Sequence, residues 1–220
     1  MPTEPLPPEL TGRLLIHCLA RDEAERRRLA RVLHDEVGQS LAMIKLHLAA
    51  VARQLGDAAP PRLHECLSLV QQAAQRAREL ALEARPSLLD DLGLVPALRW
   101  CVQHRTAQAG LNVTITADPP EPALPSDLAT VCYRVAEEAV DNVVRHARAR
   151  NLTVEVRVQS GTAEMTIRDD GVGFDVGRLG WGEPRSLLLM RERVRLAGGE
   201  LVVQSAPGGS EVRVRFACGD

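Results

Sequence analysis

Residues 25–55 have the sequence ERRRLARVLHDEVGQSLAMIKLHLAAVARQL, which contains no proline. Its apolar residues recur alternately four and three positions apart, at Val37, Leu41, Ile44, Leu48, Val51 and Leu55. This heptad repeat predicts a long helix with one apolar stripe, which we place over residues 22–55.

A second helical segment follows a break at Gly56, Asp57, Pro60 and Pro61. Its apolar residues recur every seven positions, at Leu63, Val70, Ala77 and Ala84. Two long helices joined by a short loop predict a helical hairpin over residues 22–85, with one apolar stripe left uncovered. Two hairpins would bury that stripe in a four-helix bundle, so we expect a homodimer through this hairpin. A monomer that packs the stripe against its own second half is the open alternative.

The segments on either side of the hairpin are expected to be linkers. The chain begins with a proline-rich stretch, and we treat residues 1–21 as a flexible lead-in. Pro86 ends the second helix. Residues 86–96 then form a packed connector whose glycine and proline give it the potential to act as a hinge.

Beyond residue 97 the pattern changes to mixed helices and strands. We expect helices over 95–108, 126–146 and 186–196, and strands over 112–116, 152–158, 163–167, 200–205 and 211–217. The strands alternate apolar and polar residues, which is typical of a sheet with one buried face. Residues 97–220 therefore predict an α+β two-layer sandwich with helices on one face of the sheet.

Composition excludes several classes of function. The formal charge is −2 and few residues are aromatic, so neither a basic nucleic-acid surface nor a base-stacking platform is expected. No apolar run approaches the roughly 20 residues that span a bilayer, and the N-terminus has no signal-peptide pattern. The five cysteines form no C-x-x-C pair. This favours reduced thiols in a cytoplasmic protein over a metal site.

His34 is the first candidate for chemistry, because it lies in the charged part of the first long helix. A neutral imidazole can attack phosphorus with one nitrogen while its other nitrogen donates a hydrogen bond, which the carboxylate of Asp35 could accept. Gln39 is four residues beyond Asp35, so both lie on one helix face and could orient a water that hydrolyses an acyl phosphate. The alternative is a solvated helix residue without a catalytic role.

The segment EEAVDNVVRHA, residues 137–147, is the second candidate. Glu138 and Asn142 are four apart and share a helix face. An amide oxygen can bind Mg²⁺, and a neighbouring acid can assist through a metal-bound water. Arg145 and His146 follow where cations could meet phosphates. The alternative is a solvated amphipathic helix whose C-terminal cations are stabilised by the helix dipole.

The segment RDDGVGF, residues 168–174, is the third candidate and follows a predicted strand. Gly171 and Gly173 would let the backbone approach a planar ring without a Cβ clash. The carboxylate of Asp169 could accept a hydrogen bond from an exocyclic amine and so select adenine. Taken alone, D-x-G-x-G is often only a turn.

Together these motifs resemble a known family. The motif H-D-E-x-G-Q, preceded by E-R-x-R-x-A-R, is similar to the phosphoacceptor segment of sensor histidine kinases. The similar subgroup includes nitrate and membrane-fluidity sensors that act on LuxR-type response regulators. RPSLLDDLGLVPAL, residues 85–98, resembles the connector of that subgroup. Residues 137–147 and 168–174 resemble the asparagine box and the D-x-G-x-G motif of GHKL ATPases. The resemblance covers about residues 22–217.

The resemblance implies a role for each candidate. His34 would take the γ-phosphate of ATP, oriented by Asp35, and pass it to an aspartate on the receiver domain of a response regulator. Asn142 would hold Mg²⁺ beside the acid Glu138, and Asp169 would recognise adenine. The ATP-binding domain would swing about the connector to reach His34.

One departure from the family pattern lies at the start of the last helix. The family usually has G-L-x-G-M, whereas this chain has Ser186 and Leu189 at the glycine positions. Leu189 adds bulk where close approach is expected, so we expect weakened nucleotide affinity or slow phosphoryl transfer. A kinase-deficient homologue that acts mainly as a phosphatase or scaffold is therefore a second reading. A sigma-factor-restraining serine kinase would lack the hairpin, and a purely structural dimeriser would leave the nucleotide motifs unexplained.

Overall fold

The structure is a computed structural model that describes residues 8–84, 89, 92–174 and 185–218. The chain divides into two compact units, Met1–Ser87 and Leu88–Asp220. Each unit is described by itself.

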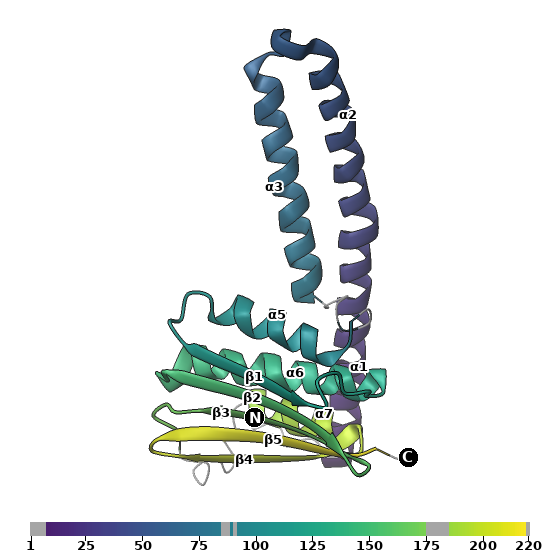
Figure 1. The fold of residues 1–220 in the computed structure, drawn as a ribbon. Coiled ribbons are helices and arrows are strands. Elements are labelled where there is room, and N and C mark those ends of the chain that lie inside the picture. Colours follow the sequence, from purple (N-terminus) through teal and green to yellow (C-terminus); the bar gives the residue numbers. More distant parts are fainter. Residues whose placement is uncertain (1–7, 85–88, 90–91, 175–184, 219–220) are drawn as a thin grey trace, which may run out of the picture. The chain divides into compact units, whose positions relative to one another are not determined.

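The first unit is the expected helical hairpin (Figure 1). Its first arm consists of α1 (Pro8–Arg31), the π-helical segment η1 (Val32–Gly38) and α2 (Gln39–Leu55). A short 3₁₀ turn, η2 (Gly56–Ala58), leads into the second arm, α3 (Pro61–Ala84). Pro61 is the first residue of α3, a position where the missing N–H of proline costs no hydrogen bond.

The helix begins earlier than the sequence predicts. We expected residues 1–21 to be a flexible lead-in, but residues from Pro8 onward are helical. Pro8 is the first helical residue, a position where the missing N–H of proline costs no hydrogen bond. The prolines before Pro8 fall outside the described residues.

The segment η1 absorbs one extra residue in the helix. From residue 17 on, the less exposed positions of α1 are 19, 23, 26, 27 and 30; those of η1 are 32, 33 and 38, and those of α2 are 41, 48, 49 and 52. The step from Leu33 to Gly38 is therefore five residues, where the preceding steps are at most four. A π-helix pairs residues five apart and so accommodates the extra residue, and such segments are frequent at functional sites.

The second unit is a two-layer α+β sandwich, as predicted. Its helices are α5 (Leu94–Thr106), α6 (Ser126–Asn142), the π-helical η3 (Val143–Ala147) and α7 (Arg185–Leu196). Its strands are β1 (Asn112–Asp118), β2 (Asn151–Gln159), β3 (Thr162–Asp169), β4 (Glu200–Ala206) and β5 (Gly209–Ala217). Figure 1 shows α5, α6 and α7 on one face of the sheet.

The sheet has the order β1-β2-β3-β5-β4. Strands β1 and β2 pair in parallel, and the other neighbours pair antiparallel. The inward residues of the strands are apolar and pack against α6, which buries Tyr133, Val135 and Val140. This core fixes the end of β3 beside the C-terminal end of α6, and the candidate site forms there.

The predicted connector is only partly a linker. Leu89 and Leu94 are buried in the apolar core of the second unit, and α5 begins at Leu94. This half of the segment 86–96 therefore belongs to the folded second unit. Residues 86–88, 90 and 91 of the expected hinge lie outside the described residues.

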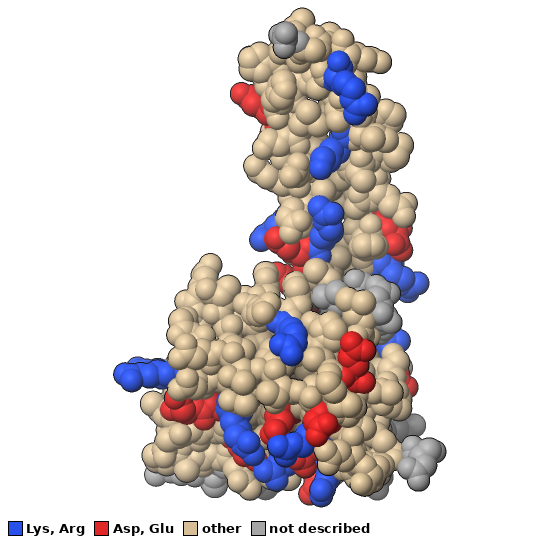
Figure 2. Space-filling view, viewed as in Figure 1, with Lys and Arg blue, Asp and Glu red and all other residues tan. Residues whose placement is uncertain are grey.

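The outer face of the sheet carries charges of both signs. Arg168 of β3 forms an ion pair of 2.5 Å with Glu211 of β5, directly opposite in the register. Arg213 also contacts Glu211, at 2.6 Å. Figure 2 shows blue and red side chains side by side over this unit. The mixed charges give the strands a solvated face rather than a basic one.

Candidate functional site

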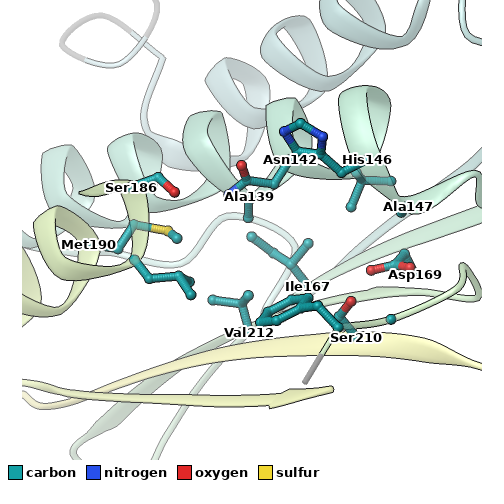
Figure 3. A pocket seen from close by; sticks show the side chains of 14 residues that line it. Ala139, Asn142, His146, Ala147, Ile167, Asp169, Ser186, Met190, Ser210 and Val212 are labelled. Carbon is teal, nitrogen blue, oxygen red and sulfur yellow. The ribbon is translucent and has the colours of Figure 1, made fainter. Parts of the chain in front are cut away.

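A cavity of about 320 Å³ opens between the helices and the sheet of the second unit. Residues of α6, η3, β3, β5 and α7 line it, and Figure 3 shows their side chains. Ile167 and Val212 of the sheet and Met190 of α7 give it apolar walls. The volume lies within the range of small-molecule sites, and such sites are mostly apolar with a few placed polar groups.

Asn142 and His146 supply polar groups from the helical wall. Asn142 is the last residue of α6 and is half-buried, while His146 lies in η3 and is exposed. Glu138, one turn before Asn142, is half-buried, and Arg145 is exposed. Neither Glu138 nor Arg145 is among the residues that line the cavity.

Asp169 supplies a carboxylate from the sheet side of the same cavity. It is the last residue of β3, and its Oδ1 accepts a hydrogen bond of 2.8 Å from the backbone N–H of Gly171. Asn142 and Asp169, which lie 27 residues apart in the chain, therefore face one space. The structure brings together the two motifs on which the sequence prediction depended.

The two glycines of the loop are required by contacts within the protein itself. A Cβ on Gly171 would lie 2.3 Å from the carbonyl oxygen of Ala147, and one on Gly173 would lie 2.0 Å from that of Ala206. Gly173 also has a φ of +65°, which disfavours other residues. The glycines thus let the loop pack against its own protein backbone. Gly173 lines the cavity, but Gly171 does not.

Asp170 fixes the loop from its other side. Its Oδ1 accepts hydrogen bonds from the backbone N–H groups of Arg150 and Asn151, at 2.7 and 2.8 Å. Its Oδ2 accepts one from Nδ2 of Asn151 at 2.7 Å. The bonds from Asn151, followed by the one from Arg150, lower the pKa of Asp170 from 3.8 to about 2. The second aspartate of the motif therefore ties the loop to the start of β2.

We expect this tie to make stability depend on pH in acid. Because the folded-state pKa of Asp170 is depressed, its contribution is present above its ordinary pKa of 3.8 and is lost as the pH falls through about 2. Urea unfolding should show that Asp170→Asn is less stable than the wild type near neutral pH. The gap should narrow as the pH falls below about 4. A gap that stays constant down to acid pH would show that the carboxylate bonds do not stabilise the fold.

The first turns of α7 form the remaining wall. Ser186, Leu187 and Met190 line the cavity, whereas Leu189 is half-buried and does not. Leu189 is therefore not part of the described cavity wall, and the expected weakening of nucleotide affinity stays a prediction. Ser186 does take a place on the wall. Residues 175–184, the segment between the D-x-G-x-G loop and α7, lie outside the described residues.

Ser210 and Val212 line the cavity from β5 and were not predicted. They lie opposite Asp169 and Ile167 of β3 in the register. A strand alternating apolar and polar residues was recognised there, but its sequence does not say which strand it pairs with. Phe174, whose N–H donates to Ser205 Oγ at 2.8 Å, was also missed.

The candidate phosphoacceptor residues lie in the first unit. His34 and Asp35 are in η1, Gln39 begins α2, and all three are exposed. An exposed imidazole is accessible to a phosphate donor. The sequence placed these residues on a continuous α-helix, whereas the structure places His34 in a π-helical segment.

Comparison with known proteins agrees with both parts. Residues 25–89 match the family model described as "Histidine kinase". Residues 128–219 match the one described as "Histidine kinase-, DNA gyrase B-, and HSP90-like ATPase". The chain belongs to the sensor histidine kinases. It combines the phosphoacceptor type of helical hairpin with the ATP-binding domain of that family.

Curated relatives include the sensor histidine kinase MctS of Rhizobium johnstonii, 35% identical over 86% of this chain and 42% of that protein. The nitrate/nitrite sensor protein NarX of Escherichia coli is 30% identical over 87% of this chain and 32% of that protein. This histidine kinase core thus spans less than half the length of either relative.

A solved structure shares the fold. The histidine kinase domain of the blue-light activated histidine kinase of Erythrobacter litoralis aligns with a TM-score of 0.54 at 23% identity. The alignment covers 89% of this chain and 93% of that one. Among the described residues, no helix is long and apolar enough to cross a membrane.

Proposed function

We propose that this histidine kinase core phosphorylates its own His34 with ATP and passes the phosphate to an aspartate of a response regulator. The observation that carries the proposal is the shared cavity of Asn142 and Asp169 in a chain that also presents an exposed His34. Each motif alone has a structural explanation. Asn142 and Asp169 line the same cavity, as the binding of one nucleotide by both would require.

The residues of the cavity fit ATP and Mg²⁺. Its apolar walls suit a planar base, and the carboxylate of Asp169 suits an exocyclic amine. At the helical side, the amide oxygen of Asn142 is a ligand that Mg²⁺ accepts together with phosphate oxygens and water. Glu138, Arg145 and His146 would complete the phosphate end. A bound Mg²⁺ would supply charge neutralisation there.

The chemistry that we assign to the chain is nucleophilic. One imidazole nitrogen of His34 forms a bond to the γ-phosphorus, the bond from that phosphorus to the bridging oxygen breaks, and ADP leaves. Asp35 accepts the hydrogen bond of the other ring nitrogen and so favours the reactive tautomer. The rate enhancement comes mainly from positioning and electrostatics.

The partner would be the receiver domain of a response regulator, with LuxR-type output as the resemblance implies. The P–N bond of phosphohistidine is labile, so an aspartate carboxylate can accept the phosphate. Asp35 and Gln39 would orient a water molecule that hydrolyses the acyl phosphate of the regulator and so switches it off. We place this exchange in the cytoplasm, where the five free thiols of the chain would stay reduced.

A kinase-deficient homologue is the second candidate, and Ser186 favours it. The serine takes a position on the cavity wall where the family usually has glycine. Such a chain would bind the regulator and dephosphorylate it without phosphorylating itself. Incubation with γ-labelled ATP and Mg²⁺ separates the two, because a kinase acquires an acid-labile label on histidine. Absence of label with retained ATP binding would favour the second candidate.

We also propose that the core is a homodimer through the hairpin, residues 22–85. Val37, Ile44 and Val51 recur every seven residues and are 37%, 46% and 44% exposed in the single chain. Leu41 and Leu48, which alternate with them, are less exposed. An apolar row left open along a helix at heptad spacing is the surface that a second hairpin would cover.

Ile44→Glu should dissociate the dimer. In a four-helix bundle this carboxylate would be buried without a partner, so we expect the dissociation constant to rise by about a hundredfold or more. Sedimentation at micromolar concentration should then show monomers. Leu46→Glu is the matched control, because Leu46 lies about 200° farther round the helix and is 62% exposed. A wild type that sediments as a monomer would contradict the dimer.

A further inference from the structure

A cluster of four charged side chains joins α5 to α6 outside the nucleotide cavity. Arg105 of α5 contacts Glu137 Oε1 through Nη2 at 2.5 Å, and contacts Asp141 Oδ2 through Nη1. Arg134 Nη1 contacts Glu137 Oε2 at 2.9 Å. The cluster has two cations and two anions and is therefore neutral.

This cluster is partly removed from water. The side chains of Arg134 and Glu137 are only 3% and 12% exposed. Burial acts to lower the pKa of Arg105, but its hydrogen bond to Asp141 and the charge of Glu137 outweigh burial and raise that pKa above its ordinary value. Arg105 is thus held charged. Loss of one member would leave a poorly solvated opposite charge, which is costly.

The position of the cluster on α6 relates it to the nucleotide site. Arg134, Glu137 and Asp141 are spaced three and four apart and form one stripe along the helix. Glu138 and Asn142 each follow a member of the stripe directly, about 100° round the axis. Fixing the rotation of the stripe about the helix axis therefore fixes the direction of the other two side chains.

Arg105 contacts the last turn of α6, where the rotation of the helix about its axis sets the direction of Asn142. Its two partners, Glu137 and Asp141, are one turn apart, and Asn142 comes immediately after them. Beyond Asn142 the helix changes to the π-helical η3, whose hydrogen bonds follow a different spacing. The guanidinium of Arg105 thus contacts the last α-helical turn before the π-helical segment begins.

We propose that Arg105 is a positioning residue for the phosphate end of the nucleotide site, holding the last turn of α6 so that Glu138 and Asn142 face Mg²⁺–ATP. This inference rests on the proposed function. Arg105 touches no cavity-lining residue in the contacts described, and its link to the site runs through Glu137 and Asp141. Asp169, which would bind the base, lies on β3 and is outside the cluster.

The selective role predicts a selective loss. In Arg105→Gln, the affinity for ATP measured by calorimetry with Mg²⁺ should fall by about tenfold, as is usual when a residue that orients a metal ligand is lost. The affinity measured in EDTA should change by less than about twofold, because the base contacts persist. The ratio of the two dissociation constants, the enhancement by Mg²⁺, is the quantity that changes.

Arg99→Gln is the matched control on the same helix. Arg99 is exposed and contacts the carbonyl oxygen of Ile115 in β1 at 3.5 Å, away from α6. This variant should keep both dissociation constants. Asp141→Asn, which removes one contact at the more exposed end of the cluster, should reduce the enhancement in the same direction by a smaller factor. If Arg105→Gln does not fold, the Mg²⁺ enhancement measured for Asp141→Asn tests the proposal in its place.

Three outcomes overturn the inference, each in a different way. If the wild type binds ATP with a Mg²⁺ enhancement that Arg105→Gln and Asp141→Asn retain, the positioning role is wrong and the proposed function stands. Equal weakening with Mg²⁺ and in EDTA also excludes the positioning role and leaves only a structural one. If the wild type shows no Mg²⁺ enhancement at all, the proposed function itself fails and the inference fails with it.

Discussion

His34→Gln should abolish the acid-labile label that the wild-type chain acquires from γ-labelled ATP. Glutamine keeps a polar side chain of similar length but has no nucleophilic ring nitrogen. The first chemical step then has no acceptor, and we expect the label to fall by at least roughly a thousandfold. ATP binding should be unchanged, because His34 lies in the first unit and the nucleotide cavity lies in the second.

His47→Gln is the matched control for this experiment. His47 is an exposed histidine of α2 in the same hairpin, and it should keep the label. Label that persists in His34→Gln, or label that is stable in acid, would contradict the assignment of His34. Label lost in both variants would indicate damage to the hairpin rather than to the nucleophile.

Asp169→Asn should weaken ATP binding by roughly a hundredfold. Oδ1 of Asp169 already accepts the N–H of Gly171, so the single oxygen of asparagine would stay in that bond. The amide NH₂ would then face the cavity and meet the amino group of adenine, donor against donor. Loss of a hydrogen bond to a charged acceptor costs about 1.5–3 kcal/mol, or roughly 10- to 150-fold in affinity, and the opposed donors place the loss toward the upper end.

A nucleotide that lacks the amino group tests the reason for this loss. Purine riboside triphosphate has no exocyclic donor, so wild type and Asp169→Asn should bind it with similar affinity. Asp170→Asn is the control within the same loop, because Asp170 bonds to Arg150 and Asn151 and does not line the cavity. It should affect stability and leave the preference for the amino group intact. An equal loss for both nucleotides in Asp169→Asn would show that the loop, not base recognition, had failed.

Local patterns predicted most of the elements of this fold. The helix α6 begins at Ser126, as the sequence predicts, and α3 begins at Pro61, which the sequence analysis assigned to the break before it. The start of α1 was missed because the prolines near the N-terminus were taken to indicate a flexible lead-in, although proline is well suited to the first helical position. Proline can interrupt a helix or begin one, and the sequence alone did not show which applies at Pro8.

The site was predicted where its motif is continuous and missed where it depends on pairing. Asn142 and Asp169 each lie in a short motif of fixed spacing, and both line the cavity as expected. Ser210 and Val212 reach it only because β5 pairs with β3, a contact across more than 40 residues of chain. Local alternation cannot specify such a neighbour.

The reason for the glycines was also beyond the motif. Gly171 and Gly173 were expected to make room for a ligand ring, yet their nearest neighbours are the carbonyl oxygens of Ala147 and Ala206. Those contacts arise from the packing of η3 and β4 around the loop. A motif names the residue that is needed, and the three-dimensional neighbours decide what it is needed for.

The five-residue step in η1 rotates the less exposed face of α1 relative to the less exposed face of α2. The heptad register of Leu48 and Leu41 leads back to position 34, which is exposed, whereas Leu33 beside it is half-buried. Deleting one residue between Leu33 and Gly38 would turn the upstream helix by about 100° relative to α2. Torsion applied to α1 would therefore reach α2 along this arm through the turn that carries His34.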